Sequence, residues 1–460
     1  MRNTCSECFS RQQKIDRLEE ELARLRQRLR YRKQEAGEGF FGSSTPSAQL
    51  PFKPNAAPAE NPKKRGAQYG HTAHVRKSAD SADADRVVPV PSVFKRACPG
   101  CGGPLQRKDT RRRLVRECRP LNAEEIVLEL PVEQCPSCDR VFHTPAPGVF
   151  KKAVLGNQLL TNAIEMSYLH GIPLGRVCEQ LGVNPGVLMG MFHRLEKLFK
   201  EAPNKLIEEY RTAPVKHADE TGWRTNGKNG YAWLFATPNL SIFQFKNTRS
   251  SSVPKAVFGD QPLPGVLVVD RYAGYNKLPC AIQYCLAHLL REVQDAEKEF
   301  PESAEIKAFV STVAPLLAMA MGLRSQAISD DEFYKKIAGV ETELKSAMQS
   351  PAQHLAIRRI QEIFTDNSKR LYHWARDRSI PADNNLAERD LRPTVIARKT
   401  SFGSQSETGA KTRGTLMTVF HTLKKRGSHP AAVFKTALDE LARDPTKDPF
   451  QLLFSAPLPP

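Results

Sequence analysis

The sequence predicts an α/β fold in which a mixed β-sheet carries a long helical insertion. Residues 265–270 form an apolar, β-branched run of the kind that makes a buried strand. Turn residues at 225–230 lead into two further runs, 231–237 and 241–246, which we expect to be strands of the same sheet. From about 287 to 378 the pattern is almost entirely helical, with periodic apolar positions.

The bulk properties indicate a globular protein with a polyanionic partner. A chain of 460 residues with 40% hydrophobic content is long enough for two to four domains. Its net charge of +18 favours binding to a polyanion, because neutralising phosphates releases counterions. A basic protein without such a partner is the alternative. We find no secretory signal at the start and no apolar run near the ~20 residues of a membrane helix, so we expect a cytoplasmic protein without a membrane partner.

The first 90 residues predict a helix and a linker. Within residues 1–35, a 3-4-3-4 spacing of apolar residues indicates a coiled-coil helix that dimerises or docks on the core, carried by Ile15, Leu18, Leu22, Leu25 and Leu29. A solvent-exposed amphipathic helix is the alternative. Residues 36–90 are rich in Pro, Ala, Ser and Gly, which predicts a flexible linker.

Two Cys-x-x-Cys pairs in residues 91–148 predict a structural zinc site. Four thiolates held in two tight turns make a closed tetrahedral Cys₄ site, and the four ligands are Cys98, Cys101, Cys135 and Cys138. The alternating residues 125–130 between the pairs are expected to form a strand of a zinc ribbon. Cys118 lies in the same gap, and we interpret it as a buried thiol or a spare.

Residues 149–210 predict a helical DNA-binding domain. We expect helices at 156–170, 174–181 and 187–200, with a turn at 182–186. A short helix, a small turn and a longer helix make the helix-turn-helix pattern, in which the longer helix enters the major groove. Compact helical hairpins in many proteins share this pattern and are the alternative.

Three acids are candidates for a catalytic metal site. Asp219 ends a short extended segment, Asp270 closes the apolar run, and Glu388 lies on a short helix that we expect Pro393 to stop. Two divalent ions roughly 3.5–4 Å apart clamp the attacking and leaving oxygens of a phosphodiester, and magnesium prefers carboxylate oxygens for this purpose. Each acid taken singly is better explained as a solvated turn residue, and it is the sequence around the acids that favours the metal site.

The neighbourhoods of these acids resemble a known family. The segments His-Ala-Asp-Glu-Thr-Gly-Trp-Arg (217–224), Val-Val-Asp-Arg-Tyr-Ala-Gly-Tyr (268–275), Cys-Leu-Ala-His-Leu-Leu-Arg (285–291), Asn-Asn-Leu-Ala-Glu-Arg-Asp-Leu-Arg-Pro (384–393) and Arg-Lys-Thr-Ser-Phe-Gly-Ser (398–404) are similar, in order, to the bacterial transposases of the IS66 insertion-sequence family.

The resemblance implies a DDE-type transposase. It implies an RNase H-like catalytic domain, here 211–430, with a helical insertion at about 287–378. The catalytic and metal-binding acids it implies are Asp219, Asp270 and Glu388, holding Mg²⁺ or Mn²⁺. The expected partners are the element ends and target DNA, other copies of the chain and accessory transposition proteins.

A basic segment follows the third acid. Residues 391–430 hold eight Lys or Arg against one acid, which predicts a surface that follows a phosphate backbone. The DNA-binding candidates here and beside Glu388 are Arg389, Arg392, Arg398, Lys399, Lys424, Lys425 and Arg426. His288 is a candidate for assisting phosphate binding, with a structural role as the alternative. We interpret residues 431–460 as a C-terminal tail.

The reaction we expect is two successive in-line displacements. The first cuts the element end, and the freed 3′ hydroxyl then attacks target DNA. The alternatives are a DNA-binding protein that has lost catalysis and a metal-dependent nuclease that cuts without strand transfer. Trp223, Tyr231 and Trp233 are interpreted as core aromatics, although one of them could stack on a flipped base.

Overall fold

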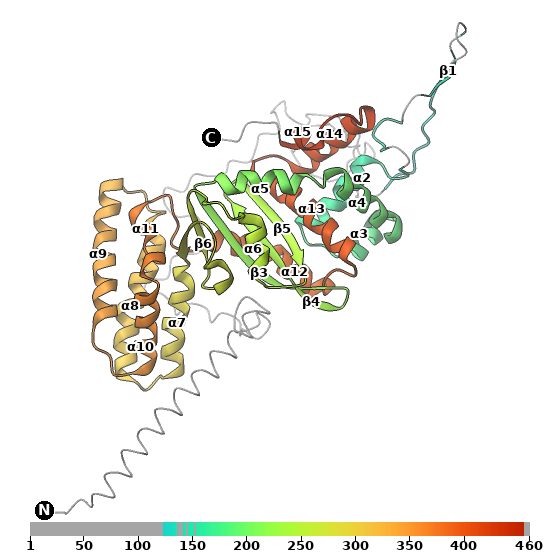
Figure 1. The fold of residues 1–460 in the computed structure, drawn as a ribbon. Helices are drawn as coiled ribbons and strands as arrows, with labels where there is room; N and C mark the ends of the chain where they lie inside the picture. Colours follow the sequence, from blue (N-terminus) through green and yellow to red (C-terminus); the bar gives the residue numbers. More distant parts are fainter. Residues whose placement is uncertain (1–122, 135, 137–140, 144–145, 151–152, 455–460) are drawn as a thin grey trace, which may run out of the picture. The chain divides into compact units, whose positions relative to one another are not determined.

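The computed structural model describes residues 123–134, 136, 141–143, 146–150 and 153–454 (Figure 1). The coiled-coil helix predicted in residues 1–35, the linker at 36–90 and all four zinc-site cysteines lie outside these residues. Those three predictions therefore stay predictions.

A mixed five-stranded sheet forms the centre of the described part. Its strands are β3 (Val215–Thr225), β4 (Lys228–Thr237), β5 (Leu240–Lys246), β6 (Val266–Val269) and β7 (Ala281–Tyr284). They lie in the order β5-β4-β3-β6-β7, with β3, β4 and β5 antiparallel and with β6 and β7 parallel to β3. This confirms the predicted mixed sheet. β6 reads Val-Leu-Val-Val and is buried along its whole length, as a strand covered on both faces requires.

The turn between β3 and β4 follows from its two central residues. Asn226 and Gly227 both have positive φ, 51° and 72°, which is the conformation of a type I′ hairpin turn. Asn-Gly is the dipeptide that adopts it with the least strain. The two-residue turn fixes the register, in which Thr225 pairs with Lys228.

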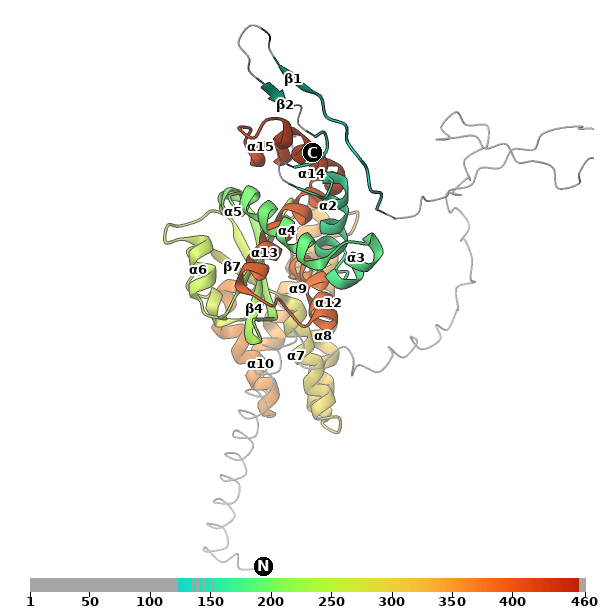
Figure 2. The same ribbon diagram turned by 90° about the vertical axis from the view of Figure 1, so that its right-hand side faces the viewer.

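Helices cover both faces of the sheet. Figures 1 and 2 show α6 on the opposite face from α12 and α13, which pack on β3, β4 and β5. The helices outside the insertion are α2 (Asn157–Ile164), a π-helical turn (Glu165–Leu169), α3 (Leu174–Leu181), α4 (Pro185–Phe199), α5 (Ala202–Thr212), α6 (Ser252–Phe258), a 3₁₀ turn (Ala273–Tyr275), α12 (Asn385–Ser401), α13 (Glu407–Lys425), α14 (Pro430–Arg443) and α15 (Pro449–Phe454).

The predicted insertion is a helical bundle beside the β6–β7 edge (Figure 1). It consists of α7 (Leu286–Glu299), α8 (Ala304–Leu323), α9 (Asp330–Gln349), α10 (Leu355–Asp366), a 3₁₀ turn (Ser368–Arg370) and α11 (His373–Arg376). Contrary to the sequence-based expectation, α8 is long and apolar enough to cross a membrane, with a mean hydropathy of 1.7 over its most apolar window. It packs between α7 and α9, and core helices meet the same criterion.

The helices before the sheet match the predicted spacing but offer little for reading bases. α3 ends at Gly182 in the left-handed conformation, and the Asn184 side chain caps α4. The first turns of α4 expose Gly186, Val187 and Gly190, none of which has a hydrogen-bonding side chain. The helix-turn-helix role therefore stays a prediction.

The strand predicted at 125–130 is wrong. Pairing begins only at β1 (Val132–Gln134), which is antiparallel to β2 (Val141–His143). Residues 125–130 have no regular structure because no strand within the described residues pairs with them, and Val127 is 90% exposed.

Two predictions about helix ends are also wrong. Pro393 lies inside α12 and does not stop it; the buried face of α12 against β3 and β4 offsets the ~3 kcal/mol that an interior proline costs. Residues 430–454 are not a tail but form α14 and α15. Phe434 and Leu438 are fully buried, so this segment is part of the core.

Candidate active site

The parallel pairing of β3 with β6 brings the first two acids together. Val215 pairs with Val266 and His217 with Val268, a constant offset of 51 residues. The pairing ends there, and Asp219 and Asp270 each follow two residues later along their own segment, at the same offset. Asp219 lies inside β3 and does not end an extended segment as the sequence suggested, whereas Asp270 directly follows β6. Each carboxylate is held by a backbone N–H: Asp219 Oδ1 accepts from Glu220 at 2.8 Å, and Asp270 Oδ1 accepts from Tyr272 at 3.0 Å.

The third acid approaches from α12. Glu388 lies in the first turn of this helix, where the helix dipole favours a negative charge. Its Oε1 is buried without a hydrogen bond, and the Arg291 guanidinium of α7 lies 3.5 Å from it as an ion pair. The insertion thus supplies a cation to the site through its first helix.

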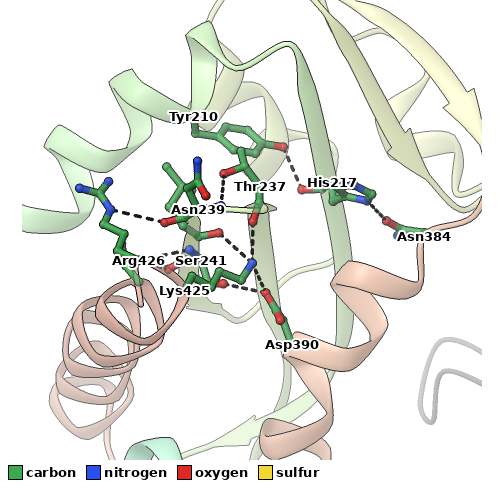
Figure 3. Close-up of polar contacts among 11 residues, drawn as sticks. Tyr210, His217, Thr237, Asn239, Ser241, Asn384, Asp390, Lys425 and Arg426 are labelled. Atoms are coloured by element: carbon green, nitrogen blue, oxygen red, sulfur yellow. Dashed lines mark hydrogen bonds and ion pairs between the residues drawn. The ribbon is translucent and has the colours of Figure 1, made fainter. Parts of the chain in front are cut away.

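Asn384 fastens α12 to the strand that carries Asp219. Its Nδ2 donates to the carbonyl of Ala218 at 2.9 Å, and its Oδ1 lies 2.8 Å from Nδ1 of His217 (Figure 3). Burial lowers the pKa of His217 to about 4, so the ring is neutral near pH 7 and its Nδ1–H donates to the amide oxygen. Although Asn384 is the N-cap residue of α12, its side chain makes no cap hydrogen bond and is used for these two contacts instead.

Asp390 makes a second attachment, two residues beyond Glu388. Its Oδ2 accepts from Ser241 Oγ at 2.7 Å and pairs with Lys425 Nζ at 2.5 Å (Figure 3). Lys425 also donates to the carbonyl of Thr237 at 2.6 Å. The helix that carries Glu388 is therefore bound through buried polar contacts to β3, β4 and β5.

The carboxylates act on one another electrostatically. Burial raises the pKa of Asp219 well above its ordinary value, and the charges of Glu220, Asp270 and Glu388 raise it further. Burial and Asp270 raise the pKa of Glu220 to about 7, against the opposing effect of Arg249. Burial and mutual repulsion of these carboxylates therefore make their charged forms less favourable inside β3 and directly after β6.

A network around Glu220 was missed at the sequence level. Arg249 donates to Glu220 Oε1 from Nε at 2.9 Å and from Nη2 at 2.8 Å, and the Tyr275 hydroxyl donates to Oε2. The Arg249 guanidinium also lies 4.2 Å from the centre of the Tyr272 ring. Tyr272 and Tyr275 belong to the quoted motif around Asp270, but nothing in the sequence pairs either of them with Glu220 or Arg249.

His288 lies beside Glu388. Cys285, His288 and Glu388 each place one potential ligand atom within 4.8 Å of the other two. The Nδ1 atom of His288 is buried and has no hydrogen-bond partner. Burial lowers the pKa of His288, so a neutral ring is favoured. The Cys285 thiol, whose pKa burial raises to about 12, is a protonated and poor ligand, and its sulfur accepts from the backbone of Asn384.

The predicted DNA-binding residues fall into two groups. Arg389, Arg392, Lys399 and Lys424 are exposed. Arg398 is half-buried and donates to Thr221 Oγ1 and the Gly222 carbonyl, at 3.0 and 2.7 Å. Lys425 pairs with Asp390, as described above, and Arg426 pairs with Glu209 at 2.6 Å. The cationic groups of these last two therefore already have partners within the protein, and Figure 3 shows the contacts of Lys425 with Asp390 and Thr237.

The donor set fits hard divalent cations. Mg²⁺ and Mn²⁺ take carboxylate oxygens, and the three acids here are half-buried with mutually unfavourable charges. The buried Glu388 Oε1 without a hydrogen bond is a further oxygen suited to such an ion. Asp219 and Asp270 are not part of the tight cluster formed by Cys285, His288 and Glu388 within the described residues.

The sheet order, with Asp219 inside β3 and Asp270 directly after β6, is consistent with an RNase H-like core, the fold class that the sequence predicted. The sequence profile of the family described as Transposase IS66 matches residues 152–412. The chain therefore belongs to the IS66 family of transposases. Membership implies an enzyme that binds, cleaves and joins DNA with divalent metal ions.

Two relatives come from Sinorhizobium fredii (strain NBRC 101917 / NGR234). The uncharacterized protein y4jD is 24% identical over 394 residues, which cover 76% of this chain and 76% of that protein. The uncharacterized protein y4qI is 23% identical over 467 residues, which cover 91% of this chain and 82% of that protein. The similarity thus extends beyond the matched family domain.

Proposed function

We propose that Asp219, Asp270 and Glu388 form the catalytic site with which this transposase cleaves element ends and joins them to target DNA. The observation that carries the proposal is the shared 51-residue offset of the β3–β6 pairing, which supports a common position for the first two acids. The effect of Glu388 on the pKa of Asp219 supports its inclusion as the third.

The three carboxylates would hold Mg²⁺ or Mn²⁺. When bound, the ions supply charge neutralisation at the attacking and leaving oxygens of the phosphodiester. The chain itself fixes the geometry: Asn384 and Asp390 hold α12 on the sheet, and Arg291 orients Glu388. Preorganised groups of this kind lower the barrier because no reorganisation is needed during the reaction.

The exposed cations of α12 would bind the DNA backbone. Arg389, Arg392 and Lys399 recur at three- and seven-residue spacing, which places them on one side of the helix that carries Glu388. Lys425 and Arg426 are left out of this surface because their charges are already paired. The zinc site, the coiled-coil helix and the helix-turn-helix role remain proposals from the sequence.

Cleavage and joining of labelled DNA with the ends of the parent element test the catalytic proposal. We expect joined products in Mg²⁺ or Mn²⁺ from the wild type, and none from Asp219→Asn, Asp270→Asn or Glu388→Gln. Asp260→Asn is the matched control, because Asp260 is an exposed acid in the loop before β6. All variants should bind DNA as the wild type does.

Two outcomes favour the alternatives. Binding without cleavage by the wild type, even with accessory proteins added, supports a DNA-binding protein that has lost catalysis. Cleavage without joined products supports a metal-dependent nuclease. Full activity of Asp270→Asn would remove this acid from the site.

A further inference from the structure

Phe402 combines an unfavourable backbone conformation with an exposed aromatic side chain. It follows the last residue of α12 in the left-handed region, with φ 58° and ψ −3°, where glycine or asparagine is usual. Its side chain is 76% exposed. A bulky residue in this conformation costs on the order of 1–3 kcal/mol, and an exposed ring recovers little of that cost by burial.

The loop that presents Phe402 is firmly attached to the β3–β4 hairpin. Ser404 N donates to the Arg224 carbonyl at 2.9 Å, and Asn226 N donates to the Ser404 carbonyl at 2.9 Å. The Trp223 indole donates to Ser404 Oγ at 3.1 Å. At Gly403, with φ 133°, an added Cβ would lie 2.2 Å from the Arg224 carbonyl oxygen, so only glycine allows this close approach. These contacts fix the backbone on the C-terminal side of Phe402, so the position of its exposed ring relative to the hairpin is well defined.

A pocket of about 210 Å³ opens beside this ring. Its walls come from the residues of β3 and β4 that flank the hairpin turn and from the end of α12. They include Trp223, Arg224, Asn229, Arg398, Lys399 and Phe402. Arg224 and Lys399 are exposed. The exposed Phe402 ring and the cationic side chains at the rim suit a flat, apolar group that belongs to a polyanion.

The pocket lies at the far end of the basic side of α12. Phe402 follows Glu388 by 14 residues, which is about 21 Å at about 1.5 Å per residue. A strand that keeps its B-form spacing up to the base at the pocket advances about 3.4 Å per nucleotide, so this length corresponds to about six nucleotides. Arg389, Arg392 and Lys399 are exposed along the path between the two residues.

We propose that the pocket takes an unpaired nucleobase of the DNA strand, which stacks on Phe402 about six nucleotides from the phosphate that is cut. This rests on the proposed function, because it assumes that the strand runs from the acids along α12. Arg224 and Lys399 would contact the phosphates that flank the stacked base. Base stacking on an aromatic side chain tolerates any sequence, so the pocket would fix the path of the strand without reading bases.

Binding of a fluorescein-labelled single-stranded dT12 oligonucleotide tests the stacking. Phe402→Gly should weaken binding about tenfold, the loss typical of one stacked base. Its melting temperature should be equal to or above that of the wild type, because glycine relieves the left-handed strain. Phe402→Leu, which keeps an apolar group but no ring, should also weaken binding. Met319→Ala is the control, since Met319 is 47% exposed on α8 of the insertion.

A fluorescence measurement reports stacking directly. Trp223, Trp233 and Trp374 are buried, so the Phe402→Trp variant has one exposed indole. Its emission should be quenched by dT12, and its affinity should match that of the wild type. Unchanged affinity in both Phe402→Gly and Phe402→Leu would overturn the proposal. So would a change in oligomeric mass in these variants with normal dT12 binding, which would assign the pocket to another copy of the chain.

The binding assays separate this proposal from the catalytic one. Normal stacking with an active Asp270→Asn variant would leave the pocket intact and reject the catalytic assignment. Loss of activity in Asp270→Asn together with unchanged dT12 binding in Phe402→Gly would support the catalytic assignment and reject the pocket proposal. A wild type that binds neither dT12 nor duplex DNA would overturn both.

Discussion

Replacing Asn384 by alanine should separate the two halves of the active site. Asn384 is 1% exposed, and its amide joins the strand of Asp219 to the helix of Glu388. The substitution removes the donor to the Ala218 carbonyl and the acceptor for the His217 ring. Both partners would be left buried without a hydrogen bond unless water enters.

The size of the effect follows from those two contacts. An unsatisfied buried polar group costs about 1–3 kcal/mol, so two of them should lower the free energy of unfolding by about 2–6 kcal/mol. Ala218 is adjacent to Asp219, and Glu388 lies four residues, about one helical turn, beyond Asn384. A displacement of about 1 Å in a catalytic group lowers the rate about 100-fold, so cleavage should fall by about this factor.

Gln283→Ala is a matched control for this prediction. Gln283 is fully buried; it donates to the Tyr284 carbonyl at 2.8 Å and accepts from His373 N at 2.8 Å. It therefore attaches the insertion to β7, and these hydrogen bonds do not involve α12. We expect a similar loss of stability with little loss of rate.

Urea unfolding and the rate of DNA cleavage at saturating Mg²⁺ measure the two effects. Both are to be made at a temperature where each variant is folded. The reasoning is refuted if Asn384→Ala is destabilised as expected but cleaves within about threefold of the wild type. It is also refuted if Gln283→Ala loses as much activity as Asn384→Ala.

Three further substitutions test other parts of the structure. His288→Ala should raise the Mg²⁺ concentration for half-maximal cleavage about 10- to 100-fold, as loss of a supporting group beside metal ligands does, with DNA affinity unchanged. Burial lowers the pKa of His421 to about 4 from an unfolded value of about 6.5, so the stability it confers is complete above about pH 6.5 and is lost as pH falls toward 4. That loss is about 3 kcal/mol, and His421→Gln should remove it from the difference between urea unfolding at pH 7 and pH 4. Gly403→Ala should lower the free energy of unfolding by more than about 1 kcal/mol because its Cβ would collide with the Arg224 carbonyl, whereas Gly322→Ala, with open space around it, should be neutral or stabilising in thermal melts.

Local patterns were sufficient to predict most secondary structure. The Asn-Gly turn at 226–227 and the alternating runs around it predicted β4 and β5, and the β-branched run predicted β6. The long helical insertion was predicted from periodicity, because α7 to α11 bury one side of each helix. The strand at 125–130 was predicted wrongly because a strand forms only where a partner strand can pair with it. The tail at 431–460 was predicted wrongly because helices α14 and α15 form where they can pack on the core. Neither the partner strand nor the packing surface can be recognised from the segment's own residues.

The position of Glu388 shows the limit of local rules. Pro393 predicted the end of α12, yet packing against the sheet outweighs the local cost of the proline. Charge density predicted Lys425 and Arg426 as DNA contacts alongside Lys399. Only the fold distinguishes their environments: Lys399 is exposed, whereas Lys425 and Arg426 are partly buried and pair with Asp390 and Glu209.

The sequence by itself determined the family, because the order of its motifs along the chain is that of the IS66 transposases. The same motifs indicate Asp219, Asp270 and Glu388 as the candidate acids. The tertiary structure decided which groups act on those acids. Three contacts join segments that are far apart in the chain: Arg249 with Glu220, Arg291 with Glu388, and Asn384 with the Ala218 carbonyl of β3. Such contacts arise from strand register and helix packing, which no local pattern encodes. The exposed, left-handed Phe402 is likewise visible only in the fold, because exposure and backbone conformation depend on what surrounds a residue.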